Sequence, residues 1–301
     1  MILCASSLRP VGDAGVDPLV RLASEAGFDG VGIGRSWLLP QASELLAVAL
    51  RAGLAPGVLA GPLGERALMP GKRYPRLGAE APDERQAAIA LTRQSLEVAG
   101  GVGMSVIALD FGPVPLRSAA ADVARLFATR ELEDYDLDEG PLGAALRERR
   151  GRAAALADAV RWSLEALLPD AERRGMALAI ELGATPWTLP SPREALDLIG
   201  LFGGARLGVA FDPAKLMVMR ALGLPLSEGR LAALRAAAVL VVENDAVGVD
   251  VGFLPGLGER DDDLVKPEGF PGKLPVVVVG PADTTDEEVT AAATLARARY
   301  E

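Results

Sequence analysis

The chain contains no histidine and only one cysteine, Cys4. Any chemistry it carries must therefore do without an imidazole base or ligand, and an internal disulfide is excluded. Its apolar runs stay well short of the ~18 residues needed to cross a bilayer. The first residues also lack the basic start and the long apolar segment of a signal peptide. We expect a soluble, cytoplasmic protein with no membrane partner.

Basic residues are scarce relative to acidic ones. The chain has 31 lysines and arginines against 41 aspartates and glutamates, which gives a formal net charge of −10. Phosphate backbones are gripped by clustered basic side chains, so nucleic acid is a poor candidate partner. Aromatic residues make up 4% of the chain, whereas 34 glycines and 22 prolines suit many short strands and tight connections. At 301 residues, one α/β barrel is as plausible as two average domains, and this composition favours the barrel.

Strand-like and helical patterns alternate along the chain. Short apolar runs typical of strands fall near 2–5, 30–34, 55–60, 105–110, 177–181, 207–212, 239–243 and 276–279. Helical periodicity falls near 16–26, 41–52, 83–100, 144–174, 192–202, 227–237 and 284–299. Repeated βα units form a parallel sheet through right-handed crossovers. Eight runs predict the α/β class and a single (β/α)8 TIM barrel domain over 1–301.

Two segments interrupt this alternation. Residues 246–275 are rich in Gly, Pro and Asp and show little helical period, so a long loop is expected in place of a full helix. Residues 113–143 form a second excursion that ends in an acidic run. Because both segments follow strand ends, we predict that they flank the same mouth of the barrel, with 113–143 as a cover or surface flap.

Four of the apolar runs stop on an acid. The fourth ends on Asp110, the fifth on Glu181 and the sixth on Asp212, and the seventh runs into 243–245 (Glu-Asn-Asp). An acid at the end of a buried strand is not needed for packing, and several of them suggest one polar site at the carboxyl ends of a parallel sheet. Strand parity places these acids on the same face as small residues, which indicates that they point into the barrel.

Three converging carboxylates would raise one another's pKa unless a cation neutralises them. The candidates are a divalent metal, Lys215 and Arg35. Lys215 follows Asp212 by three residues, and Arg35 follows the second predicted strand. Arg35 could hold an acidic substrate or pair with a neighbouring loop, and both interpretations stay open.

Several phrases resemble the xylose-isomerase-like barrels, a superfamily that includes sugar (phosphate) isomerases and epimerases, inosose and dehydroshikimate dehydratases, and endonuclease IV. They are Ala-Gly-Phe-Asp-Gly-Val-Gly-Ile-Gly at 26–34, Leu-Ala-Ile-Glu at 178–181, Gly-Val-Ala-Phe-Asp at 208–212, Val-Val-Glu-Asn-Asp at 241–245 and Leu-Pro-Gly-Leu-Gly at 254–258. The resemblance covers nearly the whole chain and implies the same barrel, with a site at its carboxyl-terminal mouth.

The departures from that family concern its metal. Members typically hold a divalent ion with a Glu ending strand five, an Asp ending strand six, a His on strand seven and a Glu ending strand eight. Glu181 and Asp212 match the first two positions, whereas the last two fall on Val242 and near Gly280. A His common three residues after the strand-six Asp is here Lys215. Two of four ligand positions thus lack a ligating side chain.

Two hypotheses for the counter-charge remain. In one, oxygen ligands suited to Mg²⁺ or Mn²⁺ form a site; its members would be Glu181, Asp212, Glu243 and Asp245. This requires strand seven to present its odd-numbered residues to the cavity. In the other, which we prefer, Lys215 replaces the metal by pairing with Glu181 or Asp212, and the site has no metal and no cofactor.

The resemblance and the surviving acids predict a divergent sugar isomerase or epimerase-like barrel that acts on or binds a small polyol or sugar. Catalytic roles fall to Glu181, Asp212 and Lys215, and substrate contacts to Arg35, Asp110, Trp187 and Asp245. Trp187 and Trp37 are loop aromatics that could stack on a sugar ring or pack in the core. A carbon–oxygen lyase is the second choice of enzyme. The alternative is an inactive barrel that binds a ligand or a partner protein. A homodimer stays open.

Overall fold

The computed structural model describes most of the chain. The described residues are 2–5, 15–35, 37–63, 74–114, 116, 140–185, 187–222, 224, 226–247, 250–259, 263–264, 266, 268–281 and 284–300. Most of the predicted excursion at 113–143 therefore lies outside the described residues. Within them, no helix combines the length and apolar character needed to span a membrane.

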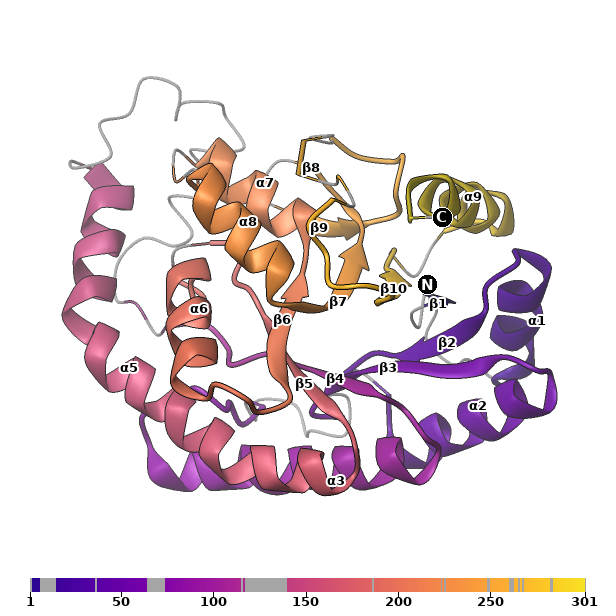
Figure 1. The fold of residues 1–301 in the computed structure, drawn as a ribbon, viewed down its shortest axis with the longest axis horizontal. Coiled ribbons are helices and arrows are strands. Elements are labelled where there is room, and N and C mark those ends of the chain that lie inside the picture. Colours follow the sequence, from indigo (N-terminus) through magenta and orange to yellow (C-terminus); the bar gives the residue numbers. More distant parts are fainter. Residues whose placement is uncertain are drawn as a thin grey trace.

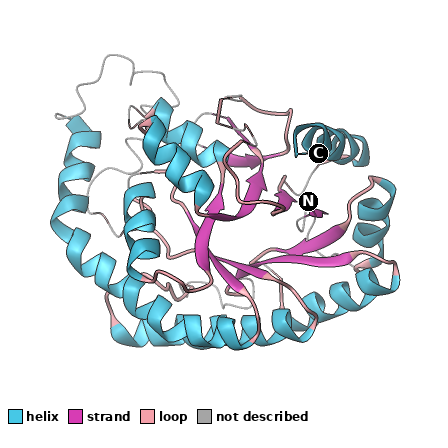
Figure 2. Cartoon of the chain, in the orientation of Figure 1, coloured by secondary structure: helices cyan, strands magenta, loops and turns pink. Residues whose placement is uncertain are grey.

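Eight parallel strands close into a barrel, with helices arranged around it (Figures 1 and 2). The barrel strands, in their order around it, are β1 (Ile2–Ala5), β10 (Pro275–Val278), β7 (Ala238–Glu243), β6 (Leu207–Phe211), β5 (Ala177–Glu181), β4 (Val106–Leu109), β3 (Ala55–Gly61) and β2 (Gly30–Ile33). Each corresponds to one of the eight predicted runs, with ends that shift by at most two residues. The predicted (β/α)8 barrel is confirmed.

Among the described residues, the helices follow the predicted alternation, with one addition. They are α1 (Asp17–Glu25), α2 (Leu39–Arg51), α3 (Pro82–Gly101), α5 (Gly140–Arg173), α6 (Pro192–Leu201), α7 (Pro213–Ala221), α8 (Glu228–Ala236) and α9 (Asp286–Tyr300). The sequence analysis missed α7. Its start carried a recognisable signal, because Asp212 caps the helix and Pro213 occupies its first turn.

No helix separates β7 from β10 among the described residues of that connection, as the composition of 246–275 predicted. A short antiparallel hairpin follows β7 instead, formed by β8 (Asp245–Val247) and β9 (Asp250–Phe253). Further along, Phe270 packs edge-on against Phe211, with ring centroids 5.1 Å apart, and also contacts Tyr300 of α9. The aromatic ring thus covers part of the sheet surface that a helix would otherwise bury.

The barrel interior and the outer layer use opposite faces of each strand. Small residues such as Ala108, Ala179 and Ala210 pack together inside the barrel. Bulky neighbours such as Ile180 and Phe211 belong to the separate core between strands and helices. This confirms the predicted strand parity. The alanines among the interior residues leave room inside the barrel at the carboxyl ends of the strands.

Gly208 is the residue that permits the close approach of β6 and β7. A Cβ atom there would lie 2.5 Å from the backbone oxygen of Ala237 and 2.5 Å from Val239. Backbone cannot yield as a flexible side chain can, so Gly208→Ala should lower the free energy of unfolding by roughly 1–3 kcal/mol. Urea denaturation measures the loss.

The matched control is Gly229→Ala in α8, where a Cβ atom would meet nothing within 4 Å. Alanine favours helix over glycine, so this variant should match the wild type or gain up to about 1 kcal/mol. Equal stability of both variants would contradict the tight β6–β7 contact.

Candidate active site at the barrel mouth

The carboxyl ends of the strands surround a cavity of about 260 Å³. Its polar lining comes from Arg35, Glu181, Asp212, Lys215 and Asn244. The apolar lining includes Val58, Ala108, Leu240 and Val277 from the barrel interior. Val251 and Gly252 of β9 also line it, so the hairpin after β7 lies at this mouth, as predicted for the start of 246–275.

Lys215 lies between two of the strand-end carboxylates. Its Nζ atom is 3.3 Å from Oε2 of Glu181 and 3.6 Å from Oδ2 of Asp212. The helix α7 brings the lysine there, because Asp212 ends β6 and Lys215 follows in the first helical turn. The predicted ion-pair reach of Lys215 is confirmed. Its assignment to catalysis stays a prediction.

Arg35 is the second cation of the mouth and comes from the loop after β2. Its Nη2 atom lies 3.1 Å from Oε2 of Glu181, and its Nη1 atom pairs with Asp110 at the rim. The same oxygen of Glu181 therefore faces both the guanidinium and the ammonium group. Asp110 also accepts a hydrogen bond from the backbone N–H of Gly112 at 2.8 Å.

Burial and the neighbouring charges shift the pKa values of these groups in opposite directions. Burial raises the pKa of Asp212, and the nearby Lys215 charge offsets this only in part. Burial alone would lower the pKa of Lys215, but Glu181 and Asp212 together hold it above its usual value. Burial likewise works against the charged form of Asp110, yet Arg35 and the Gly112 N–H keep its pKa below the usual value. Lys215 thus stays a cation at neutral pH.

The register of β7 decides which of its polar residues reach the cavity. Leu240, Val242 and Asn244 line the cavity, so the even-numbered face points inward. Glu243 points outward, where it is 1% exposed and pairs with Arg299 of α9. Its Oε2 atom also accepts a hydrogen bond from the Tyr300 hydroxyl at 2.9 Å. Glu243 therefore anchors α9 to the barrel, which corrects its proposed place in a metal site.

Asp245 also makes contacts other than the predicted one with a substrate. Its Oδ2 atom accepts hydrogen bonds from the backbone N–H groups of Gly256 at 2.6 Å and Gly258 at 3.2 Å. A Cβ atom at Gly258 would lie 2.6 Å from the backbone oxygen of Ala246, so glycine is needed for this approach. Asp245 ties the turn-rich segment to β8 and does not line the cavity, so its predicted contact with substrate is corrected.

The loop tryptophans serve packing. Trp187 is half-buried against a small apolar cluster that includes Ala214 and Val218 of α7, and it is not among the residues that line the cavity. Trp37 is buried in the core between strands and helices. Trp37 is therefore a core residue, and the contact of Trp187 with a substrate stays a prediction.

The side chains present do not fit the metal of the resembling barrels. Val242 occupies the inward strand-seven position, and at the eighth barrel strand Val277 and Val279 face the cavity. Within the described part of the chain, no three acidic, histidine or cysteine side chains are grouped so that they could hold an ion. The oxygen-only set fails because its third and fourth members, Glu243 and Asp245, are held elsewhere by α9 and by the glycine turn.

Asn244 is the polar lining residue that the sequence analysis missed. It is 6% exposed, and its Nδ2 atom donates a hydrogen bond to Oδ2 of Asp212 at 3.4 Å. Its position two residues after Val242 could have indicated it once the inward face of β7 was known. The sequence alone left that face open.

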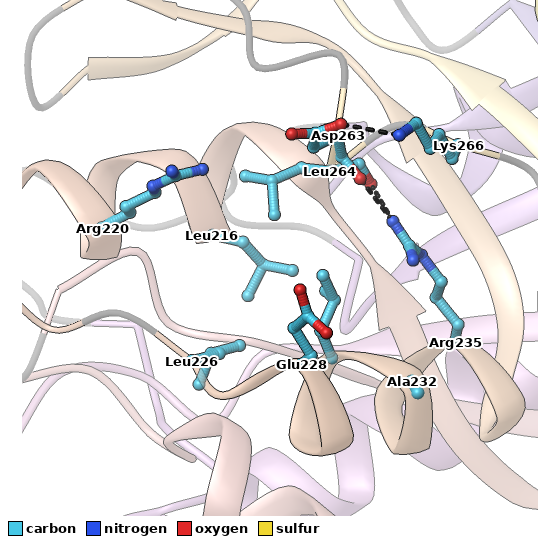
Figure 3. A pocket seen from close by; sticks show the side chains of 10 residues that line it. Leu216, Arg220, Leu226, Glu228, Ala232, Arg235, Asp263, Leu264 and Lys266 are labelled. Atoms are coloured by element: carbon cyan, nitrogen blue, oxygen red, sulfur yellow. Dashed lines mark hydrogen bonds and ion pairs between the residues drawn. The ribbon is translucent and has the colours of Figure 1, made fainter.

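A larger cavity of about 550 Å³ lies outside the barrel, between α7, α8 and residues 263–266 (Figure 3). Three of its charged residues are engaged there: Lys266 pairs with Asp263 at 2.7 Å, and Arg235 donates to the backbone oxygens of Asp263 and Leu264. Lys266 and Asp263 are both more than half exposed. We therefore place the candidate active site at the barrel mouth, where buried charges converge.

Comparisons with known proteins agree with this architecture. Residues 20–248 match the protein family described as the xylose isomerase-like TIM barrel. No curated protein sequence matches the chain.

Three solved structures illustrate the likeness. The 3-keto-D-glucoside 4-epimerase YcjR from E. coli, in its apo form, superposes with a TM-score of 0.65 and 16% identity over 99% of each chain. The D-psicose 3-epimerase from Clostridium cellulolyticum H10, solved with D-tagatose, gives 0.64 and 14% over 100% of each chain. The IOLI protein with a bound zinc atom gives 0.62 and 14% over 99% of this chain and 96% of that one. At these identities the likeness concerns the fold.

Replacing Lys215 with methionine should leave Glu181 and Asp212 without their shared cation. We expect Lys215→Met to lower the free energy of unfolding by roughly 1–3 kcal/mol at neutral pH, because the buried carboxylate of Asp212 would lose its cationic partner and Glu181 would keep Arg35 alone. Since the pKa of Lys215 is raised, the wild type keeps this stabilisation until the pH rises through that raised value. Acidification protonates the carboxylates, so the deficit of the variant should shrink as pH falls.

Urea denaturation across pH measures this difference. Lys266→Met is the matched control, because that lysine pairs with Asp263 on the surface; it should show no measurable loss. A pH-independent deficit for Lys215→Met would contradict the charge argument.

Glu243→Gln tests the corrected role of Glu243. Glutamine keeps the shape but loses the charge that pairs with Arg299, so we expect a loss of roughly 1–3 kcal/mol in unfolding free energy. Ligand binding at the mouth should be unaffected, because the side chain faces α9. Calorimetry beside urea denaturation separates the two effects, and lost binding with unchanged stability would return Glu243 to the site.

Proposed function

The chain belongs to the xylose isomerase-like TIM barrel family, and on that premise we propose that it is a divergent sugar isomerase or epimerase-like barrel that binds a small sugar or polyol at its mouth. The observation that carries the proposal is the line of alternating charges at the mouth, which runs from Asp110 through Arg35, Glu181 and Lys215 to Asp212. Sugar hydroxyl groups both donate and accept hydrogen bonds, so they can pair with either sign of charge in such a line.

The size and charge of the cavity support a small neutral ligand. Its volume of about 260 Å³ lies just below the roughly 300–1,000 Å³ of pockets for larger organic ligands. Three carboxylates and two cations leave a net charge of −1 among the five groups of this line. A phosphorylated ligand would meet repulsion there, whereas a neutral polyol would not.

The reaction that suits these groups is proton transfer at a carbon next to a carbonyl group. One carboxylate, Glu181 or Asp212, would take the proton. The C–H electron pair would form the carbon–carbon double bond of an enediolate as the π pair of the carbonyl group moves onto its oxygen. The carbonyl oxygen would then gain negative charge, which N–H donors from Lys215 and Arg35 would stabilise. Return of a proton to the opposite face, or to the neighbouring carbon, would complete epimerisation or isomerisation.

The names of similar structures point to the same class of ligand. The folds compared above include a 4-epimerase of a 3-keto-D-glucoside and a 3-epimerase of D-psicose. Both names describe a stereocentre changed on a keto sugar. At 16% and 14% identity these names support a choice of probes and not a substrate.

A second function is favoured by two valines that line the cavity. Val242 stands where the resembling barrels have a histidine ligand, and Val279 precedes Gly280, near which their strand-eight glutamate falls. Without a metal the barrel could retain binding and lose catalysis. It would then be a ligand-binding or interaction protein that uses the same mouth.

Exchange in D₂O distinguishes these functions. Protein freed of metal with EDTA is incubated with D-fructose, D-psicose, D-tagatose, xylitol and myo-inositol, and NMR follows both binding and deuterium incorporation. We expect one of the ketohexoses to bind and to gain deuterium next to its carbonyl. Glu181→Gln should slow this exchange by about 10²–10⁴-fold, whereas Thr92→Val, a buried change in α3, should not alter it.

Three other outcomes are informative. Binding without exchange would select the inactive binding protein. No binding by any of the five compounds would contradict the proposal. One tightly held Zn²⁺ or Mn²⁺ per purified chain, with exchange lost on its removal, would contradict the role given to Lys215 and Arg35.

A further inference from the structure

In the side-chain amide of Asn244, the nitrogen has a hydrogen-bond partner among the described residues and the oxygen has none. Its Nδ2 atom donates to Asp212, but its Oδ1 atom is buried and accepts no hydrogen bond from any described residue. The side chain belongs to the cavity lining, and the residue is 94% buried. Buried side-chain acceptors nearly always have a partner, so an orphan that lines a cavity calls for a donor from a ligand.

The orientation of the amide follows from its neighbour. A charged Asp212 carboxylate offers only acceptors, so the amide nitrogen must face it; the reverse orientation would oppose two oxygen acceptors. The oxygen of Asn244 is thereby directed away from Asp212.

The capping of Asp212 does not explain why an amide is needed at 244. Asp212 already receives the backbone N–H of Lys215 at 3.2 Å and lies 3.6 Å from the ammonium group of the same residue. Of the two hydrogen bonds that its carboxylate accepts, the one from Asn244 is the longer, at 3.4 Å. An apolar side chain at 244 would extend the apolar wall of Leu240 and Val242 without leaving an acceptor unpaired.

We propose that Asn244 is a specificity-determining residue whose carbonyl oxygen accepts a hydrogen bond from a hydroxyl group of the ligand. This rests on the proposed function, since it assumes that the mouth binds a sugar or polyol. Asp212 and Lys215 lie beside the amide, so the hydroxyl read by Asn244 neighbours a ligand oxygen that can accept from Lys215. The ligand class is therefore a compound with a free hydroxyl next to a carbonyl or a second hydroxyl.

The same geometry predicts which ligands the site distinguishes. A ligand with this hydroxyl would give the buried Asn244 oxygen a hydrogen-bond donor, whereas a ligand without it would leave that oxygen unsatisfied and should bind about 10- to 100-fold more weakly. The loss of any other hydroxyl should not depend on residue 244. A site in which Asn244 binds one particular hydroxyl group therefore differs from a general polar cavity. Removal of that hydroxyl from the ligand weakens binding in a way that depends on residue 244, and removal of any other does not.

The chain offers an unusually direct probe, because Asn244 is its only asparagine. Protein labelled with ¹⁵N-asparagine gives one side-chain NH₂ signal, which reports on this amide alone. The full-length protein is titrated with D-fructose and with D-fructoses that each lack one hydroxyl. The same titrations, followed by calorimetry, are made on Asn244→Leu, Asn244→Ala and the control Thr92→Val.

In the wild type, D-fructose should shift the Asn244 signal, and one deoxy compound should bind about 10- to 100-fold more weakly. Both asparagine variants should bind that compound and D-fructose equally, whereas Thr92→Val should discriminate as the wild type does. A purely structural role for Asn244 would weaken all compounds alike and keep their ratios.

Other results overturn the inference in distinguishable ways. If D-fructose binds but both asparagine variants still discriminate, the assignment of Asn244 is wrong while the proposed function stands. If D-fructose and its deoxy analogues do not bind, D-psicose and D-tagatose with their deoxy analogues replace them in the titration. The assignment and the proposed function both fail if none of the five compounds of the exchange experiment binds. Asn244→Ala supplies a second variant in case Asn244→Leu does not fold. The NMR titration of the wild type needs neither variant.

Discussion

The mouth of this barrel depends on the neutralisation of acids that the parallel sheet brings to one edge. Asp110, Glu181 and Asp212 end or follow neighbouring strands, and their charges would repel one another in a partly dry cavity. Arg35 and Lys215 meet at one oxygen of Glu181 and supply the counter-charge. Because Arg35 follows β2 and Lys215 lies in the first turn of α7, this contact also links the two halves of the chain across the barrel.

This arrangement changes what kind of chemistry the site can support. Two fixed cations donate hydrogen bonds from N–H groups, whereas a metal ion accepts electron pairs from its ligands. The cavity therefore offers donors, carboxylate acceptors and one orphan amide oxygen, a set that matches the hydroxyl and carbonyl groups of a small sugar. The inward valines Val242 and Val279 make the remaining wall apolar.

The connection after β7 contributes to the site through its departure from the repeating pattern. With no helix among its described residues, the chain first forms the β8–β9 hairpin, whose Val251 and Gly252 line the cavity. Asp245 then holds the glycine turn by its backbone N–H groups. Phe270 later fills space beside Phe211 on the outer face of β6. One segment thus lines the mouth and covers the barrel wall.

The sequence by itself determined the barrel and one half of the site. Apolar runs with a period of two or of 3.6 specify strands and helices locally, and the small residues at every second position of β5 and β6 already showed which face was inward. The acids Glu181 and Asp212 and the nearby Lys215 could be placed together for that reason. The capping signal at Asp212 also marked α7, although its short apolar pattern was overlooked.

Only the tertiary structure decided the rest. The residues of β7 are bulky on both faces, so the sequence did not show which face was inward, and a shift of one residue exchanges every side chain between the two faces. Packing against β6 and β10 and the pairing of Glu243 with Arg299 settled that register. In this register Glu243 points outward and Asn244 points inward. Arg35 was a candidate counter-charge from the sequence, but its pairing with Glu181 was not, because only closure of the barrel joins these residues, which are 146 positions apart.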